Sequence, residues 1–221
     1  MPELDYSRFV RVLTRCREVA AEPDLPAVVL QVYAVTAEQP MTSFLDAAAL
    51  VADAESDFAR ENQEAGASLD AVDRPYRVAR SATAAVLKTV KLPETLKALK
   101  TDTDKLNAIE RLLDILDDHV GQPWADTLLS GEFGQRGAAA LKEVREAIAA
   151  SKVLQKARGE RAQAYGPAYE AWLGWKRVVR DALGSTSPQY RRIHVRSSGA
   201  ADDVAEPAPE PAPAPPPVGG A

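Results

Sequence analysis

Few side chains in this sequence are placed where they could carry out chemistry together. The chain has one cysteine, Cys16, and two histidines, His119 and His194. Asp117, Asp118 and His119 are consecutive, so on a helix their side chains point about 100° apart from one residue to the next and cannot converge on one metal ion. His194 lies among arginines, which repel a cation. The sequence therefore predicts no metal site and no cofactor, with His119 on a solvated helix end.

Nucleophilic catalysis has no recognisable motif either. The Gly-x-Ser-x-Gly elbow is absent, and no strand is predicted that could present it. Cys16 lies on the apolar stripe of the first predicted helix, where a free cysteine is usually a small buried hydrophobe; a reactive thiol is the alternative. We therefore predict no catalytic residue, and a protein that is not an enzyme.

One glycine-rich segment, residues 130–137, precedes a predicted helix. Backbone N–H groups at such a helix start can bind an anion. The segment lacks the Gly-Lys-Ser/Thr ending of a Walker loop and follows no predicted strand. A plain loop between helices is therefore the simpler prediction.

Aromatic side chains gather late in the chain. Tyr165, Tyr169, Trp172 and Trp175 fall within eleven residues, and the first three share a helix face because they are spaced by four and three. Core packing is the simpler interpretation, because aromatic rings carry a large apolar area. The alternative is an aromatic-lined pocket between helices, or a partner interface.

The charge changes sign along the chain, which has a net charge of -5. The balance is -8 over residues 1–70, +5 over 71–100, -4 over 101–155 and +6 over 156–196. In one interpretation the basic helices pack beside acidic ones and screen them. In the other, the basic helices lie together and form a face for an anionic partner. The contacts predicted for that face are Arg74, Arg77, Arg80, Lys176, Arg177, Arg180, Arg191 and Arg192.

The elements that must position these side chains are predicted to be helices. Apolar residues recur every three or four positions, and hairpin turn signals are absent. Breaks are expected at Pro40, Gly66 and the pair Gly166–Pro167. Pro75 falls inside one predicted helix, or in the first turn of a helix that starts near Asp73 instead. The predicted helices cover residues 5–21, 27–37, 42–65, 69–91, 101–120, 124–129, 138–163 and 169–183, with N-cap candidates at residues 101–104.

The two halves of the chain resemble each other at an offset of 100 residues. The apolar stripe at positions 6, 9, 13, 16 and 20 recurs at 106, 109, 113, 116 and 120. Basic positions and breaks recur with it, as in Arg77 with Arg177 and Gly66 with Gly166. The pattern predicts an all-α antiparallel helical bundle built as two tandem four-helix units, residues 1–100 and 101–196. One continuous bundle with coincidental spacing is the alternative.

The last segment, residues 197–221, has a different composition. It holds seven prolines, most of them alternating with alanine, and four acidic residues. Such a segment has little to bury, so it is predicted to be a disordered, acidic, Pro/Ala-rich tail. It would serve as a solvated spacer, or as a docking tail for a Pro-binding partner. If the basic helices form a face, the acidic tail could also compete for it.

The overall composition bounds the class of protein. A chain of 221 residues that is 46% hydrophobic can bury a sizeable core. Neither a signal peptide nor an apolar run of bilayer-spanning length is recognised, so a cytoplasmic protein without membrane insertion is expected. The abundance of alanine and the preference for arginine over lysine suggest a bacterial origin.

These patterns favour a non-enzymatic helical interaction or scaffold protein, with an unidentified protein partner contacted through the basic helices. A small-molecule binder with an aromatic-lined pocket is the alternative. An enzyme of unknown type and a nucleic-acid binder are further alternatives, and the net charge of -5 argues against the second of these.

Overall fold

The computed structural model describes residues 5–88 and 90–195, and every regular element within these ranges is a helix. The prediction of an all-α chain is therefore confirmed, while the predicted tail at 197–221 lies outside the described residues. The helices are α1 (Tyr6–Ala20), α2 (Ala27–Val32), the π-helix η1 (Tyr33–Ala37), α3 (Glu38–Val86), the 3₁₀ helix η2 (Leu96–Ala98), α4 (Asp102–Asp117), α5 (Pro123–Ser130), α6 (Glu132–Leu183) and α7 (Pro188–Ile193).

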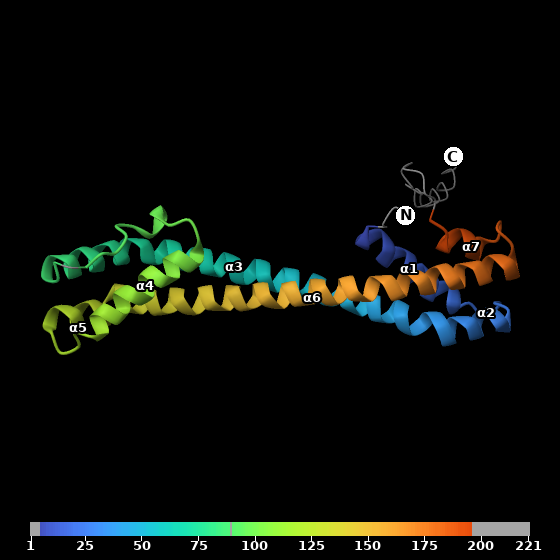
Figure 1. Cartoon of the computed structure of the whole chain (residues 1–221), viewed down its shortest axis with the longest axis horizontal. Coiled ribbons are helices and arrows are strands. Elements are labelled where there is room, and N and C mark those ends of the chain that lie inside the picture. Colours follow the sequence, from blue (N-terminus) through green and yellow to red (C-terminus); the bar gives the residue numbers. More distant parts are fainter. Residues whose placement is uncertain (1–4, 89, 196–221) are drawn as a thin grey trace, which may run out of the picture.

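Two long helices form the frame of the molecule. α3 has 49 residues and α6 has 52, and the two lie side by side in antiparallel directions (Figure 1). At about 1.5 Å per residue, each is roughly 75 Å long. α1, α2 and α7 gather at one end of the pair, and α4 and α5 at the other (Figure 1). The result is an elongated body with two thick ends and a thin middle.

Two of the expected breaks do not occur, because α3 runs through Gly66 and α6 runs through the pair Gly166–Pro167. An interior glycine costs a helix only about 1 kcal/mol, which packing on either side offsets. Pro167 lies on an exposed face, so water can reach the carbonyl group that loses its donor. Pro40 does not separate two helices either. Its ring would clash with the carbonyl of Thr36, and that residue lies in the wider π turn η1.

Pro75 lies deep inside α3, not in a first turn. A proline at this position leaves the carbonyl of Ala71, four residues earlier, without its helical donor. Arg136 of α6 supplies the missing donor, because its Nη1 donates to the Ala71 carbonyl at 3.0 Å. A contact between distant segments therefore repairs a defect that local rules treat as a helix boundary.

The region around the second short helix also differs from the prediction. Residues 132–137, expected in a loop, form the first turns of α6, and Gly131 alone separates that helix from α5. A Cβ atom on Gly134 would overlap the carbonyl oxygen of Leu129, so glycine permits this close turn. α7 was not predicted; Ser187 caps it by accepting from the N–H of Tyr190 at 3.2 Å. Thr101 caps α4 in the same way, within the range expected for that cap.

Each thick end contains its own hydrophobic cluster, and each cluster draws on both halves of the chain. One end packs Phe9 and Phe44 with Trp172 and Val179, and the other packs Tyr76 with residues such as Ile109. The thin middle buries only Val51, Ala54, Leu154 and Ala157, with Phe58 against them. The order of a short, a short and a long helix occurs twice, as α1–α2–α3 and as α4–α5–α6.

No helix within the described ranges combines the length and the apolarity that a bilayer-spanning segment needs. The exposed faces of the long helices carry many charged residues, as in the acidic middle of α3, together with single apolar residues such as Leu50, Val78 and Val153.

The continuity of α3 at Gly66 can be tested by substitution. A Cβ at Gly66 meets no atom within 4 Å, so Gly66→Ala should raise the free energy of unfolding by about 0.5–1 kcal/mol. Gly134→Ala makes the same change in α6, at a position where the added Cβ would collide with the Leu129 carbonyl oxygen. It should lower the free energy of unfolding by about 2 kcal/mol. Urea unfolding followed by far-UV circular dichroism measures both. A destabilised Gly66→Ala variant would show that the helix breaks at this position.

Candidate functional site

The eight basic residues predicted to form one face are divided between the two ends of the molecule. Because α3 and α6 are antiparallel, the end of α3 lies near α4 and α5, whereas the end of α6 lies near α1 and α7 (Figure 1). The first end carries Arg74, Arg77 and Arg80; the second carries Lys176, Arg177, Arg180, Arg191 and Arg192. The expectation that the basic helices lie together is therefore wrong, and the chain has two separate basic segments.

At the first end, the segment after α3 folds back and is held against that helix by Asp73. The Thr95 hydroxyl donates to Asp73 Oδ1 at 2.7 Å, and the Leu96 N–H donates to the same oxygen at 2.9 Å. Arg77 Nε lies 3.4 Å from Asp73 Oδ2, and the Asp73 side chain is only 6% exposed. The Tyr76 hydroxyl adds a second tie, donating to the Pro93 carbonyl at 3.0 Å. These bonds fix the position of residues 93–97.

The protonation of this anchor follows from its surroundings. Burial alone would raise the pKa of Asp73, but the hydrogen bonds from Thr95 and Leu96, with the charge of Arg77, outweigh it and hold the pKa below the usual value. Burial raises the pKa of Tyr76 to about 12, although Arg80 opposes the shift. At neutral pH, Asp73 is therefore ionised as an acceptor and Tyr76 is protonated as a donor.

The folded-back segment and α3 line an open, polar cleft of about 740 Å³. Four of its lining residues come from one face of α3, and three come from residues 94–97. They are Asp73, Arg77, Arg80, Ser81, Glu94, Thr95 and Lys97. Arg80 Nη2 makes a long bond of 3.4 Å to the Leu92 carbonyl, and its Nε is buried with no hydrogen-bond partner within the described structure. The cleft thus gathers three cationic side chains from α3 and the folded-back segment.

The second basic end is partly screened by acids. Arg192 of α7 forms ion pairs with Glu18 of α1, at 3.0 Å, and with Glu22, which follows α1. These two contacts join α7 to α1. Arg180 pairs with its neighbour Asp181 at 2.9 Å. Such exposed pairs are individually weak, so they leave the surface basic.

Lys176 is the most covered cation at this second end. Its Nζ lies 4.1 Å from the centroid of the Trp172 ring, a cation–π contact. Burial lowers the pKa of Lys176, and the charge of Arg177 adds to that effect. Arg177 and Arg191 are exposed and form no ion pair with any residue in the described ranges. These two side chains are the most available contacts at this end.

The four aromatic residues singled out in the sequence lie in the cluster at the second end. Trp175 is fully buried and donates from Nε1 to the Val29 carbonyl at 3.2 Å, while Trp172 donates to the Ile193 carbonyl at 3.1 Å. Tyr165 and Tyr169 stack with ring centroids 5.8 Å apart and are half-buried. The two indole N–H groups are thus engaged with the backbone, and the rings tie α6 to α2 and α7.

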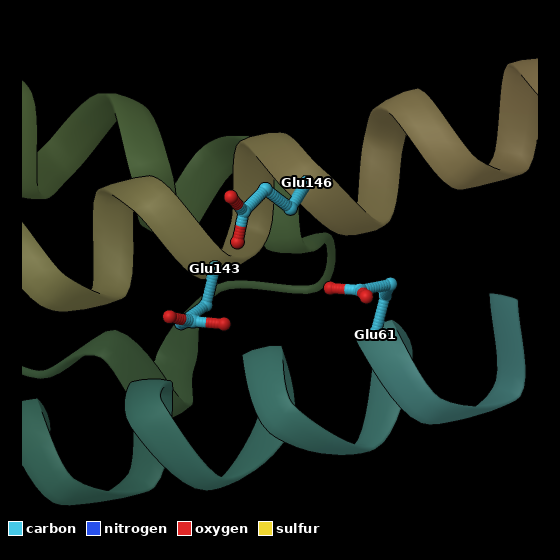
Figure 2. Close-up of side chains that lie close together, drawn as sticks. All are labelled: Glu61, Glu143 and Glu146. Carbon is cyan, nitrogen blue, oxygen red and sulfur yellow. The ribbon is translucent and has the colours of Figure 1, made fainter. Parts of the chain in front are cut away.

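A cluster that the sequence did not indicate lies in the thin middle. Glu61 of α3 faces Glu143 and Glu146 of α6, with carboxylate oxygens within 4.8 Å of one another (Figure 2). They line a groove of about 410 Å³. Lys142 lies 3.5 Å from both Glu143 and Glu146, and Arg60 lies 3.0 Å from Glu61. These bases already balance much of the charge, so a cation would have to displace Lys142.

The remaining candidates behave as structural residues. Cys16 is fully buried, as predicted, and burial raises the pKa of its thiol. The His119 ring Nδ1 lies 2.8 Å from the Ile115 carbonyl, and the ring packs near Trp124 with centroids 5.5 Å apart. Neither side chain belongs to a group of potential metal ligands in the part of the chain that the structure describes.

Comparison with known proteins yields no relative: no protein-family model, no curated protein and no solved structure matches this chain. The geometry of the two ends is therefore the basis for any functional conclusion.

The anchoring role of Asp73 predicts a pH-dependent loss of stability. Its folded pKa lies below the unfolded value, so its contribution is present above about pH 4 and disappears as the pH falls through the folded pKa. Asp73→Asn should cost about 1–3 kcal/mol at pH 7, because it removes a buried charged acceptor of two hydrogen bonds. Urea unfolding at pH 7 and pH 3 measures the difference from the unsubstituted chain, which should shrink at pH 3.

The matched control is Asp70→Asn, which alters an exposed acid one turn earlier on α3. It should leave the free energy of unfolding within about 0.5 kcal/mol at both pH values. Equal effects of the two substitutions would contradict the anchoring role.

Proposed function

We propose that this chain is a non-enzymatic scaffold that contacts an anionic protein partner through its two basic ends. The observation that carries the proposal is the placement of basic segments at opposite ends of one antiparallel helix pair. Arg177 lies 45 residues along α6 from the end where Arg77 is found, which corresponds to about 65 Å of helix. A partner engaged at both ends would therefore be an extended acidic surface, or two acidic modules.

The α3 end is basic beyond the helix itself. Lys97 lies in the segment that Asp73 holds in place, and Lys88, Lys91 and Lys100 lie close to it in the sequence; all four are exposed. Residues 71–100 have a net charge of +5, so this end combines an excess of positive charge with a shaped cleft. Complementary charge accelerates encounter and orients a partner more than it adds affinity.

Two weak contacts bind a partner more tightly when the same helix pair carries both of them. α3 and α6 pack against each other through the middle, where Arg158 Nη2 lies 2.7 Å from Glu55 Oε1. Two paired α-helices therefore maintain the distance between the ends. Once one end binds, the second contact becomes intramolecular and its effective concentration rises. An elongated shape is suited to this kind of binding, because it separates contacts that a compact domain would crowd.

We also propose that residues 1–100 and 101–196 arose by duplication. The recurring order of a short, a short and a long helix supports this origin, as does the offset of about 100 residues between Arg77 and Arg177. Two copies that pair through their long helices in opposite directions would carry one basic segment to each end. The duplication would then explain why the two contacts resemble each other.

The proposal is tested by reversing charge at one end at a time. The variants are Arg74→Glu with Lys100→Glu at the α3 end, and Arg177→Glu with Arg191→Glu at the α6 end. Lys152→Glu with Lys156→Glu makes the same change in the exposed middle and serves as the control. Chemical crosslinking in cell extract followed by quantitative mass spectrometry measures the captured proteins.

Each end variant should lose most of a shared set of acidic proteins, by about tenfold or more, whereas the control should retain them. An identical captured set for all variants would reject the proposal. Capture that disappears after nuclease treatment would also reject it, because the partner would then be nucleic acid.

A further inference from the structure

We propose that the cleft between α3 and residues 94–97 binds a phosphoryl group displayed on the protein partner. This inference rests on the proposed function and names the chemistry recognised at the α3 end. It follows from the donors in the cleft, from its charge and from the absence of apolar side chains in its lining.

The donors come from two elements that converge on one space. Arg77 and Arg80 lie on one face of α3, and Lys97 faces them from the folded-back segment. Guanidinium groups offer planar pairs of N–H donors that match phosphate oxygens, and an ammonium group adds a point charge. Three cations from two sides therefore suit an anion with several oxygens better than a single carboxylate.

Arg80 lines the cleft and is held only loosely by the rest of the described chain. Its guanidinium makes one hydrogen bond there, a long one of 3.4 Å from Nη2 to the Leu92 carbonyl. A guanidinium held in this way can turn other N–H donors toward an acceptor in the cleft. Ser81, four residues after Arg77, adds a hydroxyl donor at the same cleft.

Other polar groups in the lining hold the cleft open and do not compete for the ligand. The Thr95 hydroxyl donates to Asp73 and accepts from the Lys97 N–H at 3.2 Å, so Thr95 positions the backbone beside Lys97. Asp73 is occupied by Thr95, Leu96 and Arg77. The charge of Asp73 is largely balanced by Arg77, so Arg80 and Lys97 are the two cations with the most charge left for a ligand.

The charge balance favours a dianion. The lining has three cationic and two acidic side chains. Of the two acids, Asp73 is paired with Arg77, whereas Glu94 makes no hydrogen bond or ion pair to a described residue. Every charge in the lining acts on each charge of the ligand, so with three cations against two acids the net attraction of a dianion is about twice that of a monoanion. A phosphoryl group carries about 1.5 to 2 negative charges at pH 7.

A phosphorylated side chain fits the cleft better than a lipid headgroup. All seven lining residues are polar or charged, so none of them offers an apolar side chain for insertion into a bilayer. The cleft is also open to solvent, so the peptide that flanks a phosphoserine could lie along its edge. The partner at this end is therefore inferred to be a phosphorylated protein segment.

The experiment measures binding of a fluorescein-labelled alanine/glycine peptide with one phosphoserine, by fluorescence anisotropy on the full chain. The same peptide with serine is the comparison, and inorganic phosphate is the competitor. The phosphopeptide should bind about tenfold or more tightly than its serine form, and phosphate should displace it. Lys97→Gln and Arg80→Gln should each weaken phosphopeptide binding by about tenfold. Glu94→Gln should tighten it several-fold, because it removes a repelling charge.

The control variant is Arg111→Gln, which removes a charge from an exposed position on α4 at the same end of the molecule. It should leave the affinity unchanged within about twofold. Lys97 is exposed, so its substitution keeps the fold, and circular dichroism verifies this for Arg80→Gln. Equal binding of phosphoserine and serine peptides, or equal weakening by Arg111→Gln and Lys97→Gln, would overturn the inference.

Two further results separate this inference from the proposed function. Binding to phosphatidylcholine vesicles that contain phosphatidic acid, without binding to the phosphopeptide, would overturn it in favour of a membrane surface. If phosphopeptide binding fails while the end variants still lose their captured proteins, the phosphoryl chemistry is wrong and the scaffold proposal stands. If the end variants also capture the full set, both proposals fall.

Discussion

The antiparallel pairing of α3 and α6 determines where every other feature of the molecule lies. The two helices have nearly equal lengths, so the start of one always faces the end of the other. Phe44 therefore meets Tyr165, with ring centroids 5.9 Å apart, and Tyr76 meets Phe133 at 6.2 Å. Each end acquires a core from segments distant in sequence, and each end receives the closing turns of one long helix. Because those turns are basic, the pairing that builds the cores also separates the positive charge.

The middle of the pair depends on different contacts. Without a third helix, it relies on small residues such as Ala54 and Ala157, which allow the two backbones to approach closely, and on charge between an acidic stretch of α3 and a basic stretch of α6. Few large apolar side chains, among them Leu154 and Phe58, are found here, because only one face of each helix is covered. The ends carry the larger apolar side chains, where extra helices cover them.

Much of the helical content could be predicted from apolar periodicity, since stripes such as Phe9, Leu13 and Cys16 recur in the observed core. The helix boundaries could not be predicted in the same way, because tertiary contacts decide whether a proline or glycine ends a helix. Pro75 is accommodated by Arg136, a residue of another helix, and Gly66 lies where packing on both sides carries the helix through. Local rules describe the cost of such residues correctly, but they contain no information about what offsets it.

The candidate cleft shows the same division. Arg77 and Arg80 were predicted as contacts because their spacing places them on one helix face. Ser81, Thr95 and Lys97 were missed, because they join the site only when the segment after α3 folds back onto Asp73. A signal was present in the sequence: Asp73 adjoins the apolar stripe of Leu69, Val72 and Tyr76, and an acid beside a buried stripe usually has a partner. The pairing of Glu61 with Glu143 has no comparable signal, because it depends on the register of two helices.

The length of the helix pair also affects how the molecule would move in solution. A compact chain of 221 residues has a radius of gyration of about 17 Å, whereas a rod about 75 Å long has one of at least about 22 Å. A monomer of 23.8 kDa with this outline would experience more friction than a sphere of equal mass. It would leave a gel-filtration column early, at the volume of a larger globular protein, and would there be mistaken for a dimer. Its subunit number should therefore be taken from light scattering or sedimentation equilibrium, which report mass independently of shape.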